Sequence, residues 1–135
     1  MGLDCYASKY ERRIFLPDDI VEQFNNANIM LCENIGGYFR GKSYNTIISI
    51  IADDSLYFHG SCELTYKSLS EFIENNKEKL QKDDEEKGEI DIRNYFDDYY
   101  DNTREYYIFL LSELYGLHDF FKICYEHNLY IHSNF

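Results

Sequence analysis

The sequence predicts a small mixed α+β domain with a few short strands, four to five helices and a helical C-terminal third. Three observations indicate this fold class. Residues 2–9 alternate apolar and polar side chains, which is the period of a half-buried strand. Residues 43–52 space their apolar side chains three and four apart, as a helix with one buried face does. Beyond Ile90, tyrosine and apolar residues keep the same helical spacing.

Composition limits both the size of the fold and its partners. The 135 residues, 44% of them hydrophobic, are enough for one domain, or for one domain with a helical extension. The net charge of −12 repels nucleic acid and anionic membranes, so we expect neither as a partner and favour a basic one. No apolar run reaches the length of a membrane span, and no signal-peptide pattern is present. We expect the protein to stay in the cytoplasm of the cell that makes it. We expect no cofactor.

The first elements follow from local signals. After the strand at 2–9, residues 13–16 are expected to extend it or pair with it. Pro17 and the two aspartates that follow are typical of a helix start, because they suit the first turn and its dipole. Asn25 is expected near the end of this helix. Residues 29–32 then form a brief apolar run, which predicts a strand.

A glycine-rich loop is expected before the central helix. Gly36, Gly37 and Gly41 surround two cations, and Ser43 is predicted to cap the helix that follows. Such an arrangement is suited to binding an anion. The alternative is that the cations pair with the protein's own acids and that the glycines only form a turn. The predicted ligand-binding residues are Arg40, Gly41, Lys42, Ser43, Tyr44 and Asn45.

The middle of the chain predicts a helix and then a linker. Ser68 and Glu71 have the spacing of a capping box, so a third helix is expected to begin there. The charged residues after it predict a mobile linker. The expected organisation is an α+β core at 1–82, a charged linker at 83–89 and a tyrosine-rich helical segment at 90–135 that packs on the core.

The last third is predicted to be helical. The stripe that starts near Ile90 continues to Leu114, and Gly116 is expected to end it. A further helix is predicted at 118–127, followed by a final strand at 129–132 that joins the N-terminal sheet.

Carboxylates in this third suggest a contact surface. Asp97, Asp101 and Glu105 fall on one helix face, with a spacing close to that of nucleic-acid phosphates, and tyrosine is enriched at protein interfaces. The alternatives are a solvated face, ordinary helix packing and a homo-oligomer contact. The predicted partner-binding residues are Asp97, Asp98, Asp101, Glu105, Tyr99 and Tyr100.

Three short motifs carry a resemblance. They are the Met-Gly-Leu-Asp-Cys-Tyr-Ala start, Phe-Arg-Gly-Lys-x-Tyr at 39–44 and Ser-Leu-Tyr at 55–57. Over residues 1–80 the chain resembles a group of small uncharacterised bacteriophage and prophage proteins. The resemblance implies a phage or prophage origin and brings no activity and no catalytic residues.

The expected function is binding. One hypothesis is a phage- or prophage-encoded protein that counters a host defence by binding a basic host protein through its acidic, tyrosine-rich surface. The other is the sequestration of a nucleotide-like or phosphorylated small molecule at Arg40 and Lys42.

Catalysis and metal binding receive less support from the sequence. The four cysteines predict buried free thiols. His59 with Cys62, and His118 with Asp119, are nucleophile–base types without a third group. Cys124, His127 and His132 are too loosely spaced to predict a zinc site. We therefore expect no metal and name no catalytic residue.

Overall fold

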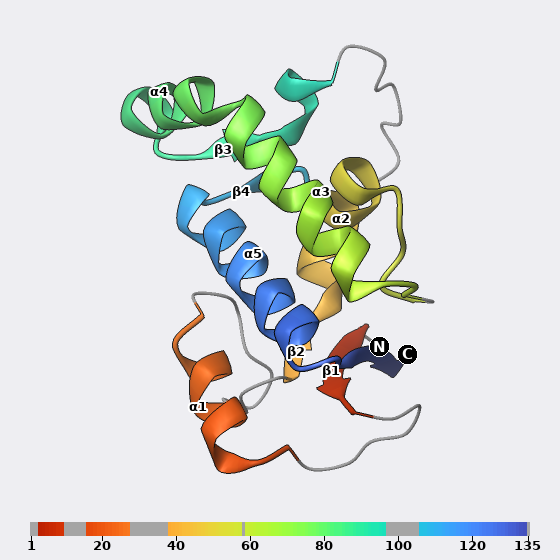
Figure 1. Ribbon diagram of the computed structural model, residues 1–135. Helices are drawn as coiled ribbons and strands as arrows, with labels where there is room; N and C mark the ends of the chain where they lie inside the picture. The colour runs from red at the N-terminus through yellow and green to blue at the C-terminus, as the bar shows by residue number, and fades with distance from the viewer. Residues whose placement is uncertain (1–2, 10–15, 28–37, 58, 97–105, 135) are drawn as a thin grey trace.

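A computed structural model describes residues 3–9, 16–27, 38–57, 59–96 and 106–134 (Figure 1). The fold is α+β, as predicted, with two small antiparallel sheets and a long helix near the C-terminus. The elements in the described ranges are β1 (Asp4–Ser8), α1 (Asp18–Asn25), β2 (Tyr38–Arg40), α2 (Gly41–Ala52), α3 (Cys62–Asn75), α4 (Lys77–Lys87), β3 (Ile90–Asp91), the 3₁₀ helix η1 (Ile92–Tyr95), β4 (Ile108–Phe109), α5 (Leu111–Glu126) and β5 (Tyr130–Asn134).

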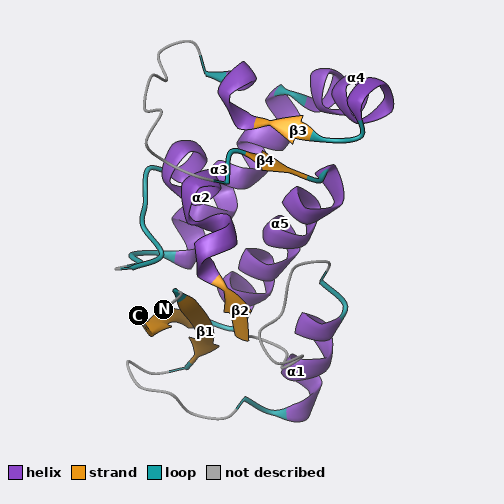
Figure 2. Ribbon diagram, turned by 180° about the vertical axis from the view of Figure 1, so that it is seen from behind, coloured by secondary structure: helices purple, strands orange, loops and turns teal. Residues whose placement is uncertain are grey.

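Helix α5 occupies the centre of the molecule. It runs from the pair β3–β4 at one end to the three-stranded sheet at the other (Figures 1 and 2). Helix α3 lies along α5, and α2 packs on α3. The Tyr44 hydroxyl on α2 donates a 2.9 Å hydrogen bond to Glu113 at the start of α5, which ties these two helices together.

The three-stranded sheet joins the two ends of the described chain. Its order is β2-β1-β5, with both pairings antiparallel. Cys5 and Ala7 of β1 are buried, as the alternation at 2–9 predicts. The final strand does join this sheet, since Ala7 is paired with Ile131, and that prediction is confirmed.

Aromatic rings fill the core between the sheet and α5. Phe120 lies 4.6 Å from Phe24 and 4.8 Å from Phe39, measured between ring centroids, and Phe121 is its neighbour on α5. The helix expected after Pro17 is present as α1, and it contributes Phe24 to this cluster. Such tilted and edge-on pairs are the favoured geometry for packed rings.

The start of α2 differs from the prediction. The helix begins at Gly41, directly after β2, and Ser43 is its third residue rather than its cap. A Cβ at Gly41 would lie 2.4 Å from the Cys5 sulfur, so this glycine serves close packing of α2 on β1. The Lys42 N–H is already used, because it donates to the Leu3 carbonyl at 3.2 Å.

The predicted start of the third helix is wrong, and so is the predicted linker. Helix α3 begins at Cys62, and its cap residue Ser61 lies seven residues before Ser68; the Ser61 hydroxyl accepts a hydrogen bond from the Leu64 N–H at 3.3 Å. Residues 77–87 form α4, so the charged segment is helical as far as Lys87. Gly88 ends the helix with a positive φ of 71°. A single buried leucine, Leu80, anchors α4 to the core.

The prediction of a long tyrosine-rich helix from Ile90 to Leu114 is also wrong. The structure describes both ends of this range, and strands occur at each. Residues 90–95 form β3 and η1, and residues 108–109 form β4, which pairs with β3. Gly116 does not stop a helix, because it is buried inside α5. The helix predicted at 118–127 is therefore the second half of α5.

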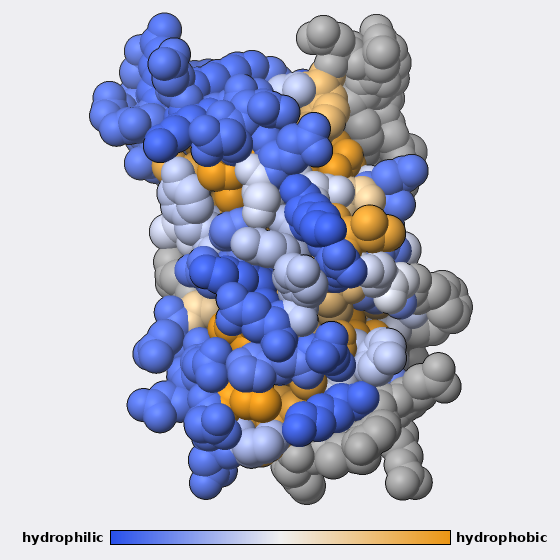
Figure 3. Space-filling view, viewed as in Figure 1, coloured by the Kyte–Doolittle hydropathy of each residue, from blue (hydrophilic) through white to orange (hydrophobic). Residues whose placement is uncertain are grey.

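The surface seen in Figure 3 is mostly hydrophilic, and charged side chains cover the region of α4. In the described part of the chain, no helix has the length and the apolar character needed to span a lipid bilayer.

Candidate functional site

Cys62 is the first residue of α3, directly after the cap residue Ser61. The free N–H groups of a helix N-terminus carry a partial positive charge, which favours a thiolate over a thiol. Cys62 is 7% exposed, and its sulfur is a free thiol that forms no disulfide with another described cysteine. Its position is therefore suited to an activated thiol.

The loop before α3 is organised by Asp54. The Asp54 carboxylate accepts hydrogen bonds from the Ser55 N–H at 2.7 Å and from the Gly60 N–H at 3.2 Å. Its Oδ2 also lies 3.4 Å from Nε2 of His59. These contacts hold in place the residues on either side of His59, just before Cys62.

The imidazole of His59 is held on several sides. Its side chain is only 1% exposed, Nε2 lies 2.8 Å from the Thr65 hydroxyl oxygen, and Phe121 packs on the ring. The Thr65 hydroxyl donates its own proton to the Ser61 carbonyl, so Nε2 of His59 must supply the proton to Thr65. This assigns the lone pair of the neutral ring to Nδ1, which is buried and has no hydrogen-bond partner among the described residues.

Cys124 of α5 faces Cys62 across the contact between the two helices. Both cysteines line the same cavity between these helices. The neighbouring Cys124 thiol, and after it His59, lower the pKa of Cys62 from 9.0 to about 6 in spite of its burial. Burial raises the pKa of Cys124 well above 9.0. The pair is therefore polarised, with the anion on Cys62 and the proton on Cys124.

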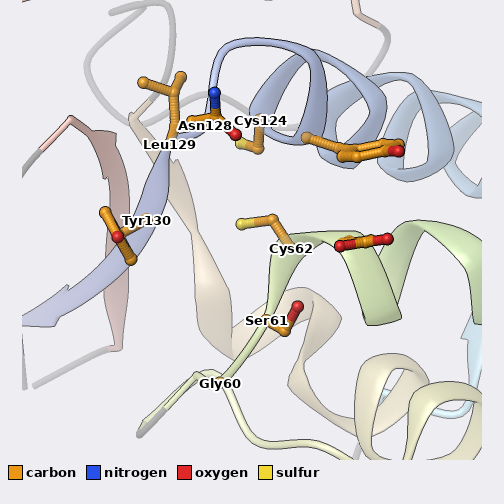
Figure 4. Close-up of a pocket in the computed structure, with 9 residues that line it drawn as sticks. Gly60, Ser61, Cys62, Cys124, Asn128, Leu129 and Tyr130 are labelled. Atoms are coloured by element: carbon orange, nitrogen blue, oxygen red, sulfur yellow. The ribbon is translucent and has the colours of Figure 1, made fainter.

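Cys62 and Cys124 both line a cavity of about 290 Å³. Figure 4 shows Cys62 at the start of α3, Cys124 on α5 and Tyr130 of β5 around this space. The residues that line it are Gly60, Ser61, Cys62, Glu63, Cys124, Tyr125, Asn128, Leu129 and Tyr130.

Cys5 provides an internal comparison. It is fully buried in β1, and its S–H donates to the Leu56 carbonyl at 3.9 Å. Burial, followed by the nearby charge of Asp4, raises the pKa of Cys5 to about 12. Cys5 is therefore an inert core thiol, as the sequence predicts.

The predicted anion-binding residues lie together at the start of α2, but they do not all face outward. Arg40 and Lys42 are exposed, and neither forms an ion pair within the described part of the chain. Tyr44 is buried and bonded to Glu113. Asn45 accepts a 2.8 Å hydrogen bond from the Leu56 N–H, so its side chain supports the loop at 53–61.

The predicted partner-binding residues cannot be placed in the same way. Asp97, Asp98, Tyr99, Tyr100, Asp101 and Glu105 all lie outside the residues that the structure describes. The same is true of the strand expected at 29–32 and of Gly36 and Gly37.

His118 lies in a separate cluster. Its Nε2 is 2.6 Å from the Ser70 hydroxyl oxygen, and burial lowers its pKa. Its Nδ1 lies 3.7 Å from Asp119, which is too long for a hydrogen bond, and the Asp119 side chain is 60% exposed. This carboxylate therefore does not orient the imidazole. In the described ranges, no three His, Cys, Asp or Glu side chains are placed to hold a metal ion.

Sequence reasoning paired His59 with Cys62 but missed Asp54, Thr65 and Cys124. Asp54 and Cys124 reach the site only through the turn after α2 and the packing of α3 on α5. One local signal was available, since Ser61 followed by Cys62 and Glu63 is a helix start of its own. Comparison of this chain with known protein families, curated proteins and solved structures finds no match.

Proposed function

We propose that this protein acts through covalent chemistry at the thiol of Cys62. The observation that carries the proposal is the geometry around that sulfur: it stands at the N-terminus of α3, beside His59 and Cys124, at the wall of a cavity. A thiolate is the nucleophilic form of cysteine, and helix N-termini and histidines are the groups that stabilise it.

The supporting residues have separate parts in this proposal. Asp54 and Thr65 orient the imidazole of His59 through Nε2. The imidazole held in this way contributes to the lowered pKa of the Cys62 thiol. Cys124, on the opposite helix, is the largest cause of that lowered pKa.

The experiment is competitive alkylation with limiting iodoacetamide near neutral pH, followed by peptide mapping. We expect Cys62 to be labelled faster than Cys5 and Cys124, because it combines thiolate character with access through the cavity. The matched control is Cys5, which has the same side chain in a sealed core. Labelling of Cys62 at or below the rate of Cys5 would overturn the proposal.

A second proposal rests on a different observation. Arg40 and Lys42 are both exposed, two residues apart, without an ion-pair partner in the described ranges, in a chain of net charge −12. Two free cations at the start of a helix favour a phosphorylated small ligand. Inorganic pyrophosphate should raise the melting temperature, and Arg40→Ala should reduce that rise while Lys9→Ala leaves it unchanged. Equal rises in all three proteins would contradict it.

The acidic charge supports a third proposal, a phage- or prophage-type protein that binds a basic host protein. Binding of this kind weakens as salt rises. It is tested by replacing Asp97 and Asp101 with Asn and Glu105 with Gln. If the affinity for a captured basic partner survives this triple change, the acidic face is not the contact.

A further inference from the structure

We propose that Cys62 and Cys124 act together as a dithiol that reduces a disulfide, with Cys62 as the attacking sulfur and Cys124 as the resolving one. The inference rests on the proposed function, because it needs Cys62 to be nucleophilic. It goes further by naming the substrate class and a second reacting residue. Both cysteines are free thiols on two packed helices, α3 and α5, and both line the same cavity (Figure 4).

The two sulfurs differ in the way this chemistry requires. Cys62 lines the cavity at the end of a helix, whereas Cys124 has no exposed surface and reaches the cavity from the side of α5. An attacking thiol must be accessible and ionised, and a resolving thiol needs only to reach the first sulfur. The low pKa of Cys62 and the raised pKa of Cys124 agree with these two parts.

The reaction balances in two steps. The Cys62 thiolate attacks one sulfur of the substrate, its S–S bond breaks, and the first substrate thiolate leaves and takes a proton from water. The Cys124 sulfur then attacks the Cys62 sulfur, and the mixed disulfide breaks. The second substrate thiolate leaves with the Cys124 proton. The two cysteines are oxidised to one disulfide, and the substrate disulfide is reduced to two thiols.

The cavity admits such a substrate. Its volume of about 290 Å³ is close to the lower end of ordinary ligand sites. Its rim carries two exposed rings, Tyr125 at 39% and Tyr130 at 52%, which offer apolar faces to an approaching group. The expected substrate is therefore a disulfide flanked by an apolar group. Both a peptide and a low-molecular-weight compound can present such a disulfide.

The test treats the reduced protein with either glutathione disulfide or a peptide bridged by one cystine. The reaction is stopped with acid, and the products are mapped by mass spectrometry without reduction. We expect a Cys62–Cys124 disulfide in the wild type with at least one of the two probes, and the faster probe identifies the source. In Cys124→Ser, the resolving thiol is gone, and a mixed disulfide should accumulate on Cys62.

Two results would overturn the inference. One is a wild-type protein that shows no Cys62–Cys124 bond with either probe. The other is Cys124→Ser losing its mixed disulfide as fast as the wild type does.

If Cys62 still alkylates rapidly in the same preparation, the reactive thiol stands and only the dithiol reaction fails. If Cys62 is inert in both assays, the proposed function fails as well. The wild-type measurement needs no variant, so misfolding of Cys124→Ser cannot hide the answer.

Discussion

The Nε2 atom of His59 lies 3.4 Å from Oδ2 of Asp54, in the loop that leads directly into Cys62. The same carboxylate accepts hydrogen bonds from the N–H groups of Ser55 and Gly60. The Asp54 side chain therefore fixes both the loop backbone and the orientation of the imidazole, through Nε2. This arrangement leaves Nδ1, rather than Nε2, free to act on a thiol.

Replacing Asp54 with Asn should destabilise the protein by about 1–3 kcal/mol, because two backbone N–H groups and an imidazole lose an anionic acceptor. The neighbouring Asp53→Asn is the matched control. Asp53 is exposed with a φ of 49°, a conformation that asparagine tolerates well, so its cost should stay below about 0.5 kcal/mol. Urea unfolding measures both. Equal effects at the two positions would contradict the role given to Asp54.

Changing Cys124 should move the pH dependence of Cys62 alkylation. In the wild type, the rate should rise with a midpoint near the Cys62 pKa of about 6. Cys124→Ala removes the neighbouring thiol, which is the largest cause of the lowered pKa, so the midpoint should move toward 9.0. Cys124→Ser keeps a donor at the same place and should move it less. An unchanged midpoint in the alanine variant would show that the contact between the sulfurs does not stabilise the thiolate.

The lowered pKa of Cys62 also predicts how stability depends on pH. Between about pH 6 and 9, the folded protein holds a thiolate where the unfolded chain binds a proton, so the free energy of unfolding should increase with pH. The gain is complete above pH 9 and lost as the pH falls through about 6. Cys62→Ser removes this contribution. The difference between the wild type and this variant should therefore grow across the window, and a flat difference would contradict the assignment.

Gly41→Ala should cost about 1–3 kcal/mol, because its Cβ would meet the Cys5 sulfur at 2.4 Å and Leu3 at 3.0 Å inside the core. Gly60→Ala is the control. Among the described residues, its Cβ would meet Asp54 alone, at an ordinary 3.6 Å, so it should be neutral or slightly stabilising. Thermal melting of the two variants distinguishes them. A neutral Gly41→Ala would mean that a simple turn, rather than close packing, explains this glycine.

Sequence reasoning predicted the fold class and the elements that have clear local signals. The structure confirms three such elements: the strand at 2–9, the helix after Pro17 and the final strand at 129–132. They could be predicted because alternation or helix-start residues mark them in the sequence. Near Tyr107 the helical prediction is wrong. Almost every residue there is aromatic or apolar, so periods of 3.6 and 2 fit the sequence equally well. The structure selects period 2: Tyr107 and Phe109 are buried, while Tyr106 and Ile108 are exposed.

The misplaced helix starts have a related cause. Ser68 has the spacing of a cap, yet it lies inside α3, because Leu69 and Phe72 must face the core that the packing on α5 creates. The charged run before Gly88 predicted a linker, but Leu80 is buried and the Tyr95 hydroxyl donates to Asp83 at 2.7 Å. Tertiary contacts of this kind decide the outcome, and a local pattern does not contain them.

Half of the thiol site could be predicted from the sequence. His59 and Cys62 are three residues apart, so their proximity is local information. Cys124 enters from a different helix, and only the packing of α3 on α5 brings its sulfur to Cys62. No spacing rule predicts such a contact.

The ionisation of Cys62 is the central claim, and thiolate absorbance in the ultraviolet measures it most directly. The absorbance of the reduced wild type, minus that of Cys62→Ser, should show one step with a midpoint near pH 6. A difference spectrum that stays flat until the ordinary thiol pKa of 9.0 would contradict the account, because Cys62 would then be a neutral thiol beside His59 and Cys124.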